Sequence, residues 1–294
     1  IQGISMNSQE PSSLYDAYYF SHGCGMPYER NEHWLTFFGA IADSIVQEIQ
    51  PESVLDAGCA MGFLVEALRQ RDVEAFGVDI SEYAIEKIHP DIQSFCWVGS
   101  VVQSFPRKYD LIVCIEVLEH MAPWDAEQAL INFCQHSDDI LFSSTPFDYK
   151  EATHFSVRPL EHWASLFARQ GFYRDVDFDA SFITPWAVRF QRRRDSLPRI
   201  IQDYERNFWR LWKENTDLRS LTLDMRNELA AKERHIQYSQ ETLHDQIQTL
   251  HDQIQTLHDQ IQEKDSIIAG LHKKEREQRQ ASIRLGDQLV EKEQ

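Results

Sequence analysis

A stretch near the start of the chain combines residue types that bind nucleotides. Residues 53–80 read SVLDAGCAMGFLVEALRQRDVEAFGVDI, which predicts a strand, a turn, an amphipathic helix and a second strand that ends at Asp79. Gly58 and Gly62 lack a Cβ, so the backbone can turn tightly after Asp56 and approach a ligand closely. The first amides of the helix have no partners within the helix, and Asp79 can accept hydrogen bonds from two ribose hydroxyls. The pattern predicts a pocket for a cofactor that contains a nucleoside.

The spacing of this turn argues against a dinucleotide. Dinucleotide sites use G-x-G-x-x-G, whose middle glycine lets the backbone approach a pyrophosphate. Here Cys59 and Ala60 stand where that glycine would be, which favours a cofactor without phosphates. The alternative interpretation is that the turn only connects strand and helix tightly and that Asp79 is a solvated loop residue. The order of Asp56, the glycines and Asp79 within one strand-helix-strand unit favours the site.

The segment resembles the first signature of the class I S-adenosylmethionine-dependent methyltransferases, and the resemblance extends over residues 12–191. It implies an α/β fold, with a doubly wound, Rossmann-like sheet of seven strands, and S-adenosylmethionine as the cofactor. It also implies the residues that bind this cofactor, which are Asp56, Gly58, Cys59, Gly62, Phe63, Asp79, Ile80, Ser100 and Glu116.

Two of these residues follow later strands. Gly99 and Ser100 come after the third expected strand, where the family often has a short polar side chain against the adenine; many relatives have an acid there instead. Residues 116–120, EVLEH, are similar to a family segment that borders the methionine end of the cofactor. His120 is therefore a candidate for a direct catalytic role. The alternative is a partly buried imidazole beside a helix-start acid.

His154 is the main candidate for a general base. It lies on the loop after the fifth expected strand, at the mouth of the predicted pocket. A sugar hydroxyl is a poor nucleophile at neutral pH, and a histidine can accept its proton during methyl transfer. The alternative is a loop histidine that only hydrogen-bonds to backbone or substrate. No cysteine or acid spacing demands a metal, and none is expected.

The segment 15–34, YDAYYFSHGCGMPYERNEHW, is rich in aromatic side chains with polar tips. Such side chains suit a lid that covers the cofactor and contacts an acceptor, and an N-terminal flap without this role is the alternative. The run is similar to one in methyltransferases of bacterial surface-polysaccharide assembly, many of them linked to glycosyltransferases. That resemblance implies a glycan or sugar acceptor and a glycosyltransferase partner. The candidate lid and substrate residues are Tyr15, Tyr19, His22, Tyr28 and Arg30.

Alternating strand-like and helix-like runs position these residues. Regular alternation predicts a parallel, doubly wound sheet with ligands at the carboxyl ends of its strands. The final two strands are expected to form an antiparallel pair. The expected strands are 53–56, 75–79, 93–98, 109–115, 140–145, 172–178 and 186–190. The expected helices are 31–50, 63–70, one capped by Ser81, 125–136 and 159–170, the last ending at Gly171.

Composition limits the classes of function. The net charge of −18 argues against nucleic acid as a partner, because phosphate contacts need clustered lysine and arginine. Five cysteines without metal-ligand spacing indicate reduced core residues and a cytoplasmic protein. No apolar run approaches the roughly 20 residues of a membrane span. Residues 1–11 are expected to be a tag remnant and a flexible N-terminus.

Residues 243–263 contain three successive heptads, LHDQIQT, LHDQIQT and LHDQIQE. Leucine takes position d and isoleucine position a, which favours a parallel two-stranded coiled coil. Polar residues at later core positions keep a trimer open as the alternative. The histidines at position e are expected to be flanking surface rather than metal ligands. These sets are Leu243, Leu250 and Leu257 (d); Ile247, Ile254 and Ile261 (a); Ile268, Leu271, Leu285 and Leu289 (continuing core); Lys264, Glu275 and Gln278 (polar core); and His244, His251 and His258 (e).

The segment between the globular part and the coil is amphipathic. Its apolar face comprises Ile200, Ile201, Tyr204, Phe208, Leu211 and Trp212. It is expected to be an adaptor helix, with peripheral contact at the inner face of the membrane as the alternative. The predicted organisation is a methyltransferase domain (12–194), the adaptor helix (195–222) and a coiled coil (223–294). A helix from Pro198 to the end would extend about 140 Å.

Three functions are consistent with the sequence. The first is O-methylation of a sugar hydroxyl of a bacterial surface glycan or its precursor. A sharper form is a chain-terminating cap with the coil as spacer, which would resemble bacterial O-antigen chain terminators. The second is methylation of a small-molecule acceptor, and the third is a non-catalytic coiled-coil scaffold.

Overall fold

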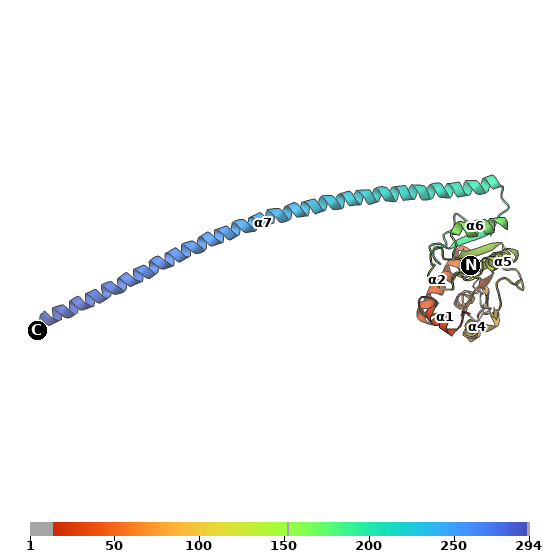
Figure 1. Cartoon of the computed structure of the whole chain (residues 1–294), viewed down its shortest axis with the longest axis horizontal. Coiled ribbons are helices and arrows are strands. Elements are labelled where there is room, and N and C mark those ends of the chain that lie inside the picture. The colour runs from red at the N-terminus through yellow and green to blue at the C-terminus, as the bar shows by residue number, and fades with distance from the viewer. Residues whose placement is uncertain (1–13, 152, 293–294) are drawn as a thin grey trace, which may run out of the picture. The chain divides into compact units, whose positions relative to one another are not determined.

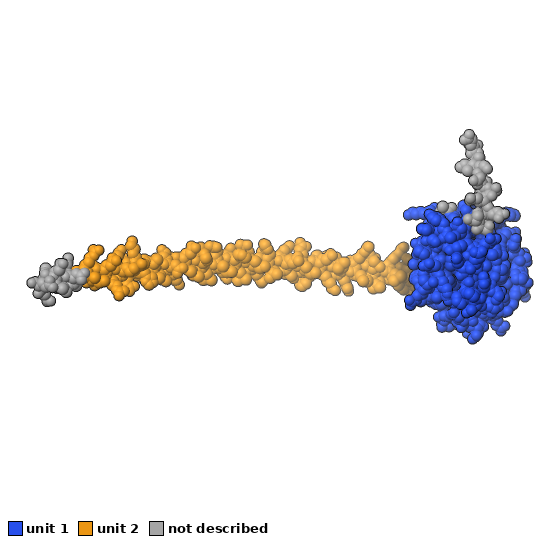
Figure 2. All heavy atoms as spheres, turned by 90° about the horizontal axis from the view of Figure 1, so that it is seen from below, with its two compact units in different colours: residues 1–210 blue, residues 211–294 orange. Residues whose placement is uncertain are grey.

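The computed structural model describes residues 14–151 and 153–292, with side chains up to residue 284. Residues 1–11, the expected tag remnant, lie outside this range, as do the side chains of Leu285 and Leu289. The chain forms two compact units, residues 1–210 and residues 211–294, coloured separately in Figure 2.

Unit 1 is built on a seven-stranded sheet with the order β3-β2-β1-β4-β5-β7-β6. Strands β1 to β5 pair in parallel, whereas β7 is antiparallel to both of its neighbours. The predicted α/β sheet of seven strands is therefore confirmed, including the antiparallel closing pair. The strands are β1 (Ser53–Ala57), β2 (Glu74–Asp79), β3 (Cys96–Val98), β4 (Leu111–Ile115), β5 (Asp139–Ser143), β6 (Phe172–Arg174) and β7 (Val188–Arg192).

Helices cover both faces of the sheet. Alternate residues of a strand point to opposite faces, and β4 shows the division. Leu111 and Val113 pack with residues of α2 and α3, whereas Ile112 and Cys114 pack with residues of α5 and α6. The sheet is thus doubly wound. The helices, labelled in part in Figure 1, are α1 (Ala17–His22), α2 (Glu32–Glu48), α3 (Phe63–Arg69), α4 (Glu82–Glu86), α5 (Pro123–His136) and α6 (Leu160–Arg169), with short 3-10 turns at Pro90–Phe95 (η2) and Leu118–His120 (η3).

Local signals in the sequence explain most of the helix boundaries. The side chains of Asn31 and Ser81 accept hydrogen bonds from the backbone amides of Trp34 and Ala84, so they cap α2 and α4 as predicted. Gly171 follows α6 with φ +79°, a conformation that suits glycine after a helix.

All seven expected strands shift by at least one residue; β1 and β2 each gain one residue, β4 starts at Leu111 and β5 spans Asp139–Ser143. Three of the differences have a local cause. Residues 93–95 belong to η2, so β3 is only three residues long. Strand β6 ends at Arg174, because the Asp175 side chain accepts a hydrogen bond from the Asp177 amide and turns the chain. The last strand starts two residues late, after a turn in which the Ala187 amide donates to the Thr184 carbonyl.

A single helix, α7 (Leu197–Lys292), forms the C-terminal region (Figure 1). Its first residues belong to unit 1. Ile200 is buried there, Asp203 forms an ion pair with Arg193 at 2.9 Å, and the Tyr204 hydroxyl accepts a hydrogen bond from the Arg174 amide. The composition changes near residue 194, but the packing of unit 1 continues to Arg210.

The rest of α7 confirms the predicted long helix. The heptad positions are exposed on the single chain, with Ile247 at 47% and Ile254 at 63%. The coiled coil itself stays a prediction. Among the described residues, no helix has the length and apolar character needed to cross a membrane.

Candidate functional site

The turn between β1 and α3 has the conformation that its glycines predicted. Gly58 has φ +92° and Gly62 has φ +73°, both in the region that favours glycine. A Cβ on Gly58 would lie 2.3 Å from Cγ2 of Val117, so glycine also lets this turn contact the loop after β4. Ala60 adopts φ +45° between them, and its amide points to Asp79.

Asp79 lies at the carboxyl end of β2 and organises the turn. Its Oδ2 accepts a hydrogen bond from the Ala60 amide, and its Oδ1 accepts one from the Ser81 amide, both at 2.8 Å. Each carboxylate oxygen has a second lone pair, so two acceptor positions remain for ribose hydroxyls. Burial raises the pKa of Asp79, while backbone hydrogen bonds from Ser81, Ala60 and Ile80 lower it.

Asp56 lies beneath this turn at the end of β1, and it is buried. Burial, reinforced by the nearby charge of Asp79, raises its pKa to about 8. No hydrogen bond from a described residue reaches its carboxyl group. A buried carboxyl with these properties suits a ligand that carries positive charge.

The remaining predicted cofactor residues take different positions. Ser100 follows β3 close to Asp79, because Asp79 pairs with Val98 in the sheet. The side chain of Cys59 packs in the core, where a Cβ on Gly77 would lie 2.6 Å from its Sγ, so only the Cys59 backbone belongs to the turn. Phe63 is buried in an aromatic cluster, and Glu116 follows β4.

The N-terminal segment packs over the glycine turn. Phe20, Met61, Phe63 and Ala84 form a buried cluster to which Tyr15, Tyr19 and Tyr28 add partly buried rings. The Tyr28 ring centroid is 5.1 Å from that of Phe63. The structure thus brings three of the five predicted lid residues together.

The other two predicted lid residues lie elsewhere. Arg30 forms an ion pair with Glu66 of α3 at 2.6 Å, which anchors the segment rather than facing the site. His22 is exposed at the end of α1, where it stacks on Tyr18.

Tyr15 connects the ribose side of the site to a second group of charges. Its backbone carbonyl accepts a hydrogen bond from the Ser81 hydroxyl, and its own hydroxyl donates to the His120 carbonyl at 3.3 Å. Burial raises its pKa to about 12, with further contributions from Asp79, Glu151 and Glu119. The carboxylates at the ends of β2 and β4 therefore belong to one site.

Two carboxyl groups follow β4. Glu116 adopts φ +53°, which is uncommon for a residue with a Cβ, and its Oε1 accepts a hydrogen bond from Trp186 Nε1 at 2.9 Å. Glu119 is fully buried, and its Oε1 accepts a hydrogen bond from the Thr145 amide at 3.3 Å. Burial raises the pKa of Glu119 well above its ordinary value, and the adjacent Glu116 raises it further.

His120 and His154 lie side by side, with ring centroids 4.5 Å apart. Nδ1 of His120 is 3.0 Å from the Thr153 hydroxyl, which in turn donates to Glu151 Oε1 at 2.6 Å. Nδ1 of His154 is 2.8 Å from the Asp148 carbonyl oxygen, and its Nε2 is 3.1 Å from Glu151 Oε2. Burial, with a smaller contribution from His154, lowers the pKa of His120 to about 4.

These contacts bear on the predicted general base. Both ring nitrogens of His154 face oxygen acceptors, so the contact with Glu151 requires a proton between Nε2 and Oε2. His154 can therefore accept a substrate proton only when no proton lies between its Nε2 and Glu151 Oε2. The role of His154 as general base stays a prediction, and Glu151 must act together with it. Glu151 was missed in the sequence, although an acid three residues before a candidate base was an available signal.

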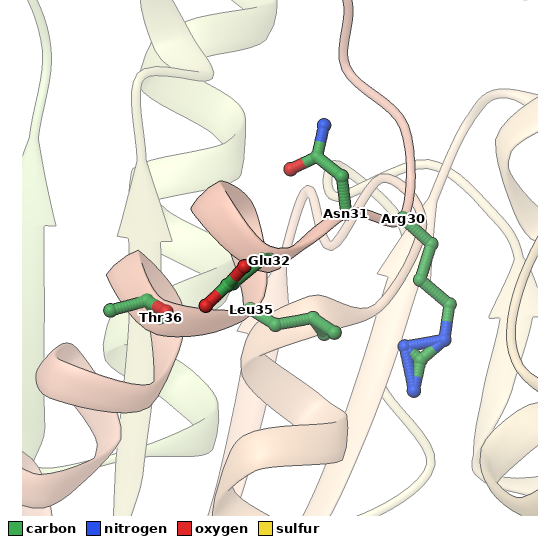
Figure 3. Close-up of a pocket in the computed structure, with 5 residues that line it drawn as sticks. All are labelled: Arg30, Asn31, Glu32, Leu35 and Thr36. Carbon is green, nitrogen blue, oxygen red and sulfur yellow. The ribbon is translucent and has the colours of Figure 1, made fainter.

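A separate surface depression lies at the start of α2 (Figure 3). It is shallow and lined by Arg30, Asn31, Glu32, Leu35 and Thr36. None of the predicted cofactor residues lines it, so it is not the cofactor site.

Comparison with known proteins identifies the class. Residues 28–177 match the model of a methyltransferase domain family, which covers half of the chain. The ubiquinone biosynthesis O-methyltransferase of Azoarcus sp. (strain BH72) is 29% identical over 127 residues, which are 40% of this chain and 54% of that protein. The enzyme of the same name from Nitrosomonas europaea is 31% identical over 88 residues, 27% of this chain and 37% of that protein. The chain thus spans about half or less of the length of these relatives.

Two solved structures are also similar. Magnesium protoporphyrin IX methyltransferase from Synechocystis PCC 6803 with bound S-adenosylmethionine has 18% identity and a TM-score of 0.46, with 64% of this chain and 100% of that chain covered. The sugar N-methyltransferase KedS8 from Streptoalloteichus sp. has 12% identity and a TM-score of 0.47, with 66% and 98% covered.

The chain belongs to the methyltransferase domain family. Its methyltransferase class and the cofactor S-adenosylmethionine are those that the resemblance implied. The residues around the glycine turn fit this cofactor. Asp79 has free acceptor positions for ribose, and the buried Asp56 suits the cationic methionine end.

Proposed function

We propose that this enzyme O-methylates a sugar hydroxyl of a bacterial surface glycan or its precursor. The observation that carries the proposal is the cluster of His120, Glu151 and His154 beside the cofactor residues, which offers proton acceptors to a hydroxyl. A hydroxyl needs such a group because its oxygen is a poor nucleophile while protonated. The polar tips of Tyr15 and Tyr19 over the site suit a sugar.

The proposed reaction uses the residues as follows. S-adenosylmethionine supplies an electrophilic methyl group on a sulfonium sulfur. The acceptor oxygen forms a bond to the methyl carbon while the carbon–sulfur bond breaks and leaves its electrons on sulfur. The hydroxyl proton passes to the His154–Glu151 pair. The Asp148 carbonyl and Thr153 hydroxyl hold the two imidazoles in orientation.

Labelled methyl transfer tests the acceptor. The full chain is incubated with methyl-labelled S-adenosylmethionine and, in parallel, with cell-envelope oligosaccharides and with catechol-type phenols. Label in an alkali-stable ether of the oligosaccharide supports the proposal. Asp79→Ala is the matched control, because it removes the ribose acceptor and should abolish both signals.

A phenolic small molecule is the second candidate. It is favoured by the curated relatives, which are named as ubiquinone biosynthesis O-methyltransferases. Label in the phenols with none in the oligosaccharides would replace the glycan by this acceptor. Label in neither, with cofactor binding intact, would contradict both.

The second half of the proposal concerns α7. Its exposed heptad residues support self-association as a parallel dimer, with a trimer as the alternative outcome. The three near-identical heptads also support a spacer that sets the distance between the active site and a membrane-bound partner such as a glycosyltransferase. In this form the enzyme caps and terminates the glycan chain.

Changing the length of the helix tests the spacer. Deleting residues 250–256 removes one heptad without changing the pattern of a and d positions. If the helix measures length, the glycan length distribution in cells should shift with each heptad removed or added. An unchanged distribution with normal methylation would leave α7 with self-association alone.

Peripheral contact with the cytoplasmic face of a membrane is part of the same proposal. Ile201 and Phe208, at the start of α7, are 51% and 66% exposed. Their insertion into a bilayer surface would be favourable. The full chain should float with anionic vesicles, whereas the double variant Ile201→Ser/Phe208→Ser should be lost from the lipid fraction. Flotation of both proteins alike would contradict this contact.

A further inference from the structure

The histidine cluster has the composition of a metal site. Glu119, His120 and His154 each place one ligand atom within 4.8 Å of those of the other two. They come from two loops, one after β4 and one after β5, that meet at the carboxyl edge of the sheet. No metal-ligand spacing marks this set in the sequence, because His154 lies 34 residues after His120.

An independent observation points into this cluster. Glu119 is fully buried, yet its Oε2 has no hydrogen-bond partner among the described residues. A buried carboxylate oxygen without a partner is costly. A cation between this oxygen and the two imidazoles would supply the missing interaction.

Hydrogen bonds at Nδ1 of both histidines place the lone pair on Nε2, and a cation would replace the 3.1 Å contact that His154 Nε2 makes with Glu151 Oε2. The Thr153 hydroxyl donates to Glu151 and therefore accepts from Nδ1–H of His120. Nδ1 of His154 faces the Asp148 carbonyl and must also donate. Histidines that bind metals commonly donate the other ring N–H to a backbone carbonyl or to a hydrogen-bonded polar group. In both residues the lone pair is then on Nε2.

We propose that Glu119, His120 and His154 bind one divalent cation. Mixed carboxylate and imidazole ligands suit Mn²⁺, Fe²⁺, Co²⁺ or Zn²⁺ better than Ca²⁺. A cation would also offset the cost of burying the Glu119 carboxylate.

The role of the cation rests on the proposed O-methylation. A hydroxyl bound to a divalent cation loses its proton more readily. Within the His154–Glu151 pair, the cation takes the lone pair of His154 Nε2, which leaves the Glu151 carboxylate to accept the proton. The oxygen then forms its bond to the methyl carbon as the carbon–sulfur bond breaks toward sulfur.

A binding measurement tests the site without any acceptor. The tag-free full chain is treated with chelator, dialysed and titrated with Mn²⁺ and Co²⁺ by calorimetry, and the Co²⁺ complex is examined by visible absorption. One cation per chain is expected for the unchanged protein. Glu119→Gln and His154→Asn should each weaken binding by about 100-fold or more and alter the Co²⁺ spectrum.

Two controls keep the outcome specific. Asp148→Asn keeps the backbone carbonyl that orients His154. It removes one carboxylate of a second candidate group, Asp148, Glu151 and His154, in which Asp148 is the exposed member. His162→Asn removes a histidine outside the cluster. Both variants should bind the cation normally. Unchanged S-adenosylmethionine affinity and thermal unfolding in Glu119→Gln would show that the fold is intact.

The proposal is overturned if the unchanged protein binds neither cation at millimolar concentration. It is also overturned if Glu119→Gln and His154→Asn bind as tightly as the unchanged protein, which would place the cation elsewhere, for example on the histidines of α7. Loss of cation binding in Asp148→Asn would assign the cation to the second group, Asp148, Glu151 and His154. Methyl transfer to glycan is measured separately, so failure of the metal site leaves the acceptor assignment standing.

Discussion

The two units of this chain use apolar residues in opposite ways. In unit 1 they are buried against the same chain; Phe133, Phe142 and Phe167 have no exposed surface. In the part of unit 2 with described side chains, the large apolar residues are exposed and recur at heptad spacing; Leu243, Leu250 and Leu257 are each 57% exposed. Unit 1 therefore buries its apolar residues within one chain, whereas the exposed stripe of unit 2 supports the proposed coiled coil. Chemistry and association should be separable by mutation.

The largest separable effect is expected for His154→Ala. Loss of its contacts with Glu151 and Asp148 should lower the turnover of methyl transfer by about 10²–10⁴-fold, because the acceptor proton is no longer removed. Affinity for S-adenosylmethionine should be unchanged, because Asp56 and Asp79 are untouched. Steady-state kinetics with calorimetric titration of the cofactor measure both quantities. Equal losses in turnover and affinity would show that His154 supports the pocket instead.

Asp79→Ala should act on the cofactor. The substitution removes the acceptors for ribose and the hydrogen bond that holds the Ala60 amide. We expect affinity for S-adenosylmethionine to fall by about 100-fold, since two hydrogen bonds to a charged group are lost. Calorimetry measures this change, and sedimentation velocity should show the same oligomeric state as the unchanged protein. Retained affinity would remove Asp79 from the site.

A change in unit 2 should have the converse effect. Replacing Ile247 and Ile254 by Asn puts polar groups at two a positions of the predicted seam. We expect the dissociation constant for self-association to rise by about 10–100-fold, or about 1.4–2.7 kcal/mol, with unchanged cofactor affinity. Sedimentation equilibrium over a dilution series measures the constant. His251→Asn, at a flanking position, is the control, and a monomeric unchanged protein would contradict the coil.

The two units also differ in what their sequence predicted. In unit 1 the glycine turn, Asp79 and the caps Asn31 and Ser81 were predictable, because local backbone conformation and hydrogen bonding determine them. The ends of β3 and β6 were not, because short polar contacts there outweigh strand propensity. In unit 2 the heptads predicted the helix, while the number of helices in the coil depends on partner packing that one chain does not contain.

Within the site, too, features set by local sequence could be predicted and features set by loop packing could not. Residues at strand ends could be placed, since the carboxyl ends of parallel strands share one edge. The ion pair of Arg30 with Glu66 and the contact of Glu151 with His154 depend on how loops pack, which no local pattern records. For the same reason His22 and Arg30 were assigned to the predicted lid, whereas only Tyr15, Tyr19 and Tyr28 of its five residues pack together in the structure.

The last prediction concerns Asp56 and the stability of unit 1. Its pKa in the folded, cofactor-free protein is about 8, against an ordinary value near 3.8, so the folded state keeps a proton that the unfolded state has lost. Between these values its contribution to the free energy of unfolding should fall by about 1.4 kcal/mol per pH unit as pH rises. The groups whose charges couple to it are Asp79, Tyr28, Cys59 and Cys114.

Asp56→Asn isolates this effect, because the amide has a similar shape and does not ionise. Urea unfolding of both proteins at pH 5, 6 and 7, monitored by tryptophan fluorescence, gives the difference in unfolding free energy at each pH. That difference should grow in favour of the variant as pH rises, and binding of the cationic cofactor should diminish it. A constant difference would mean that Asp56 is ionised in the fold, and the buried carboxyl would then already be balanced by a partner in unit 1.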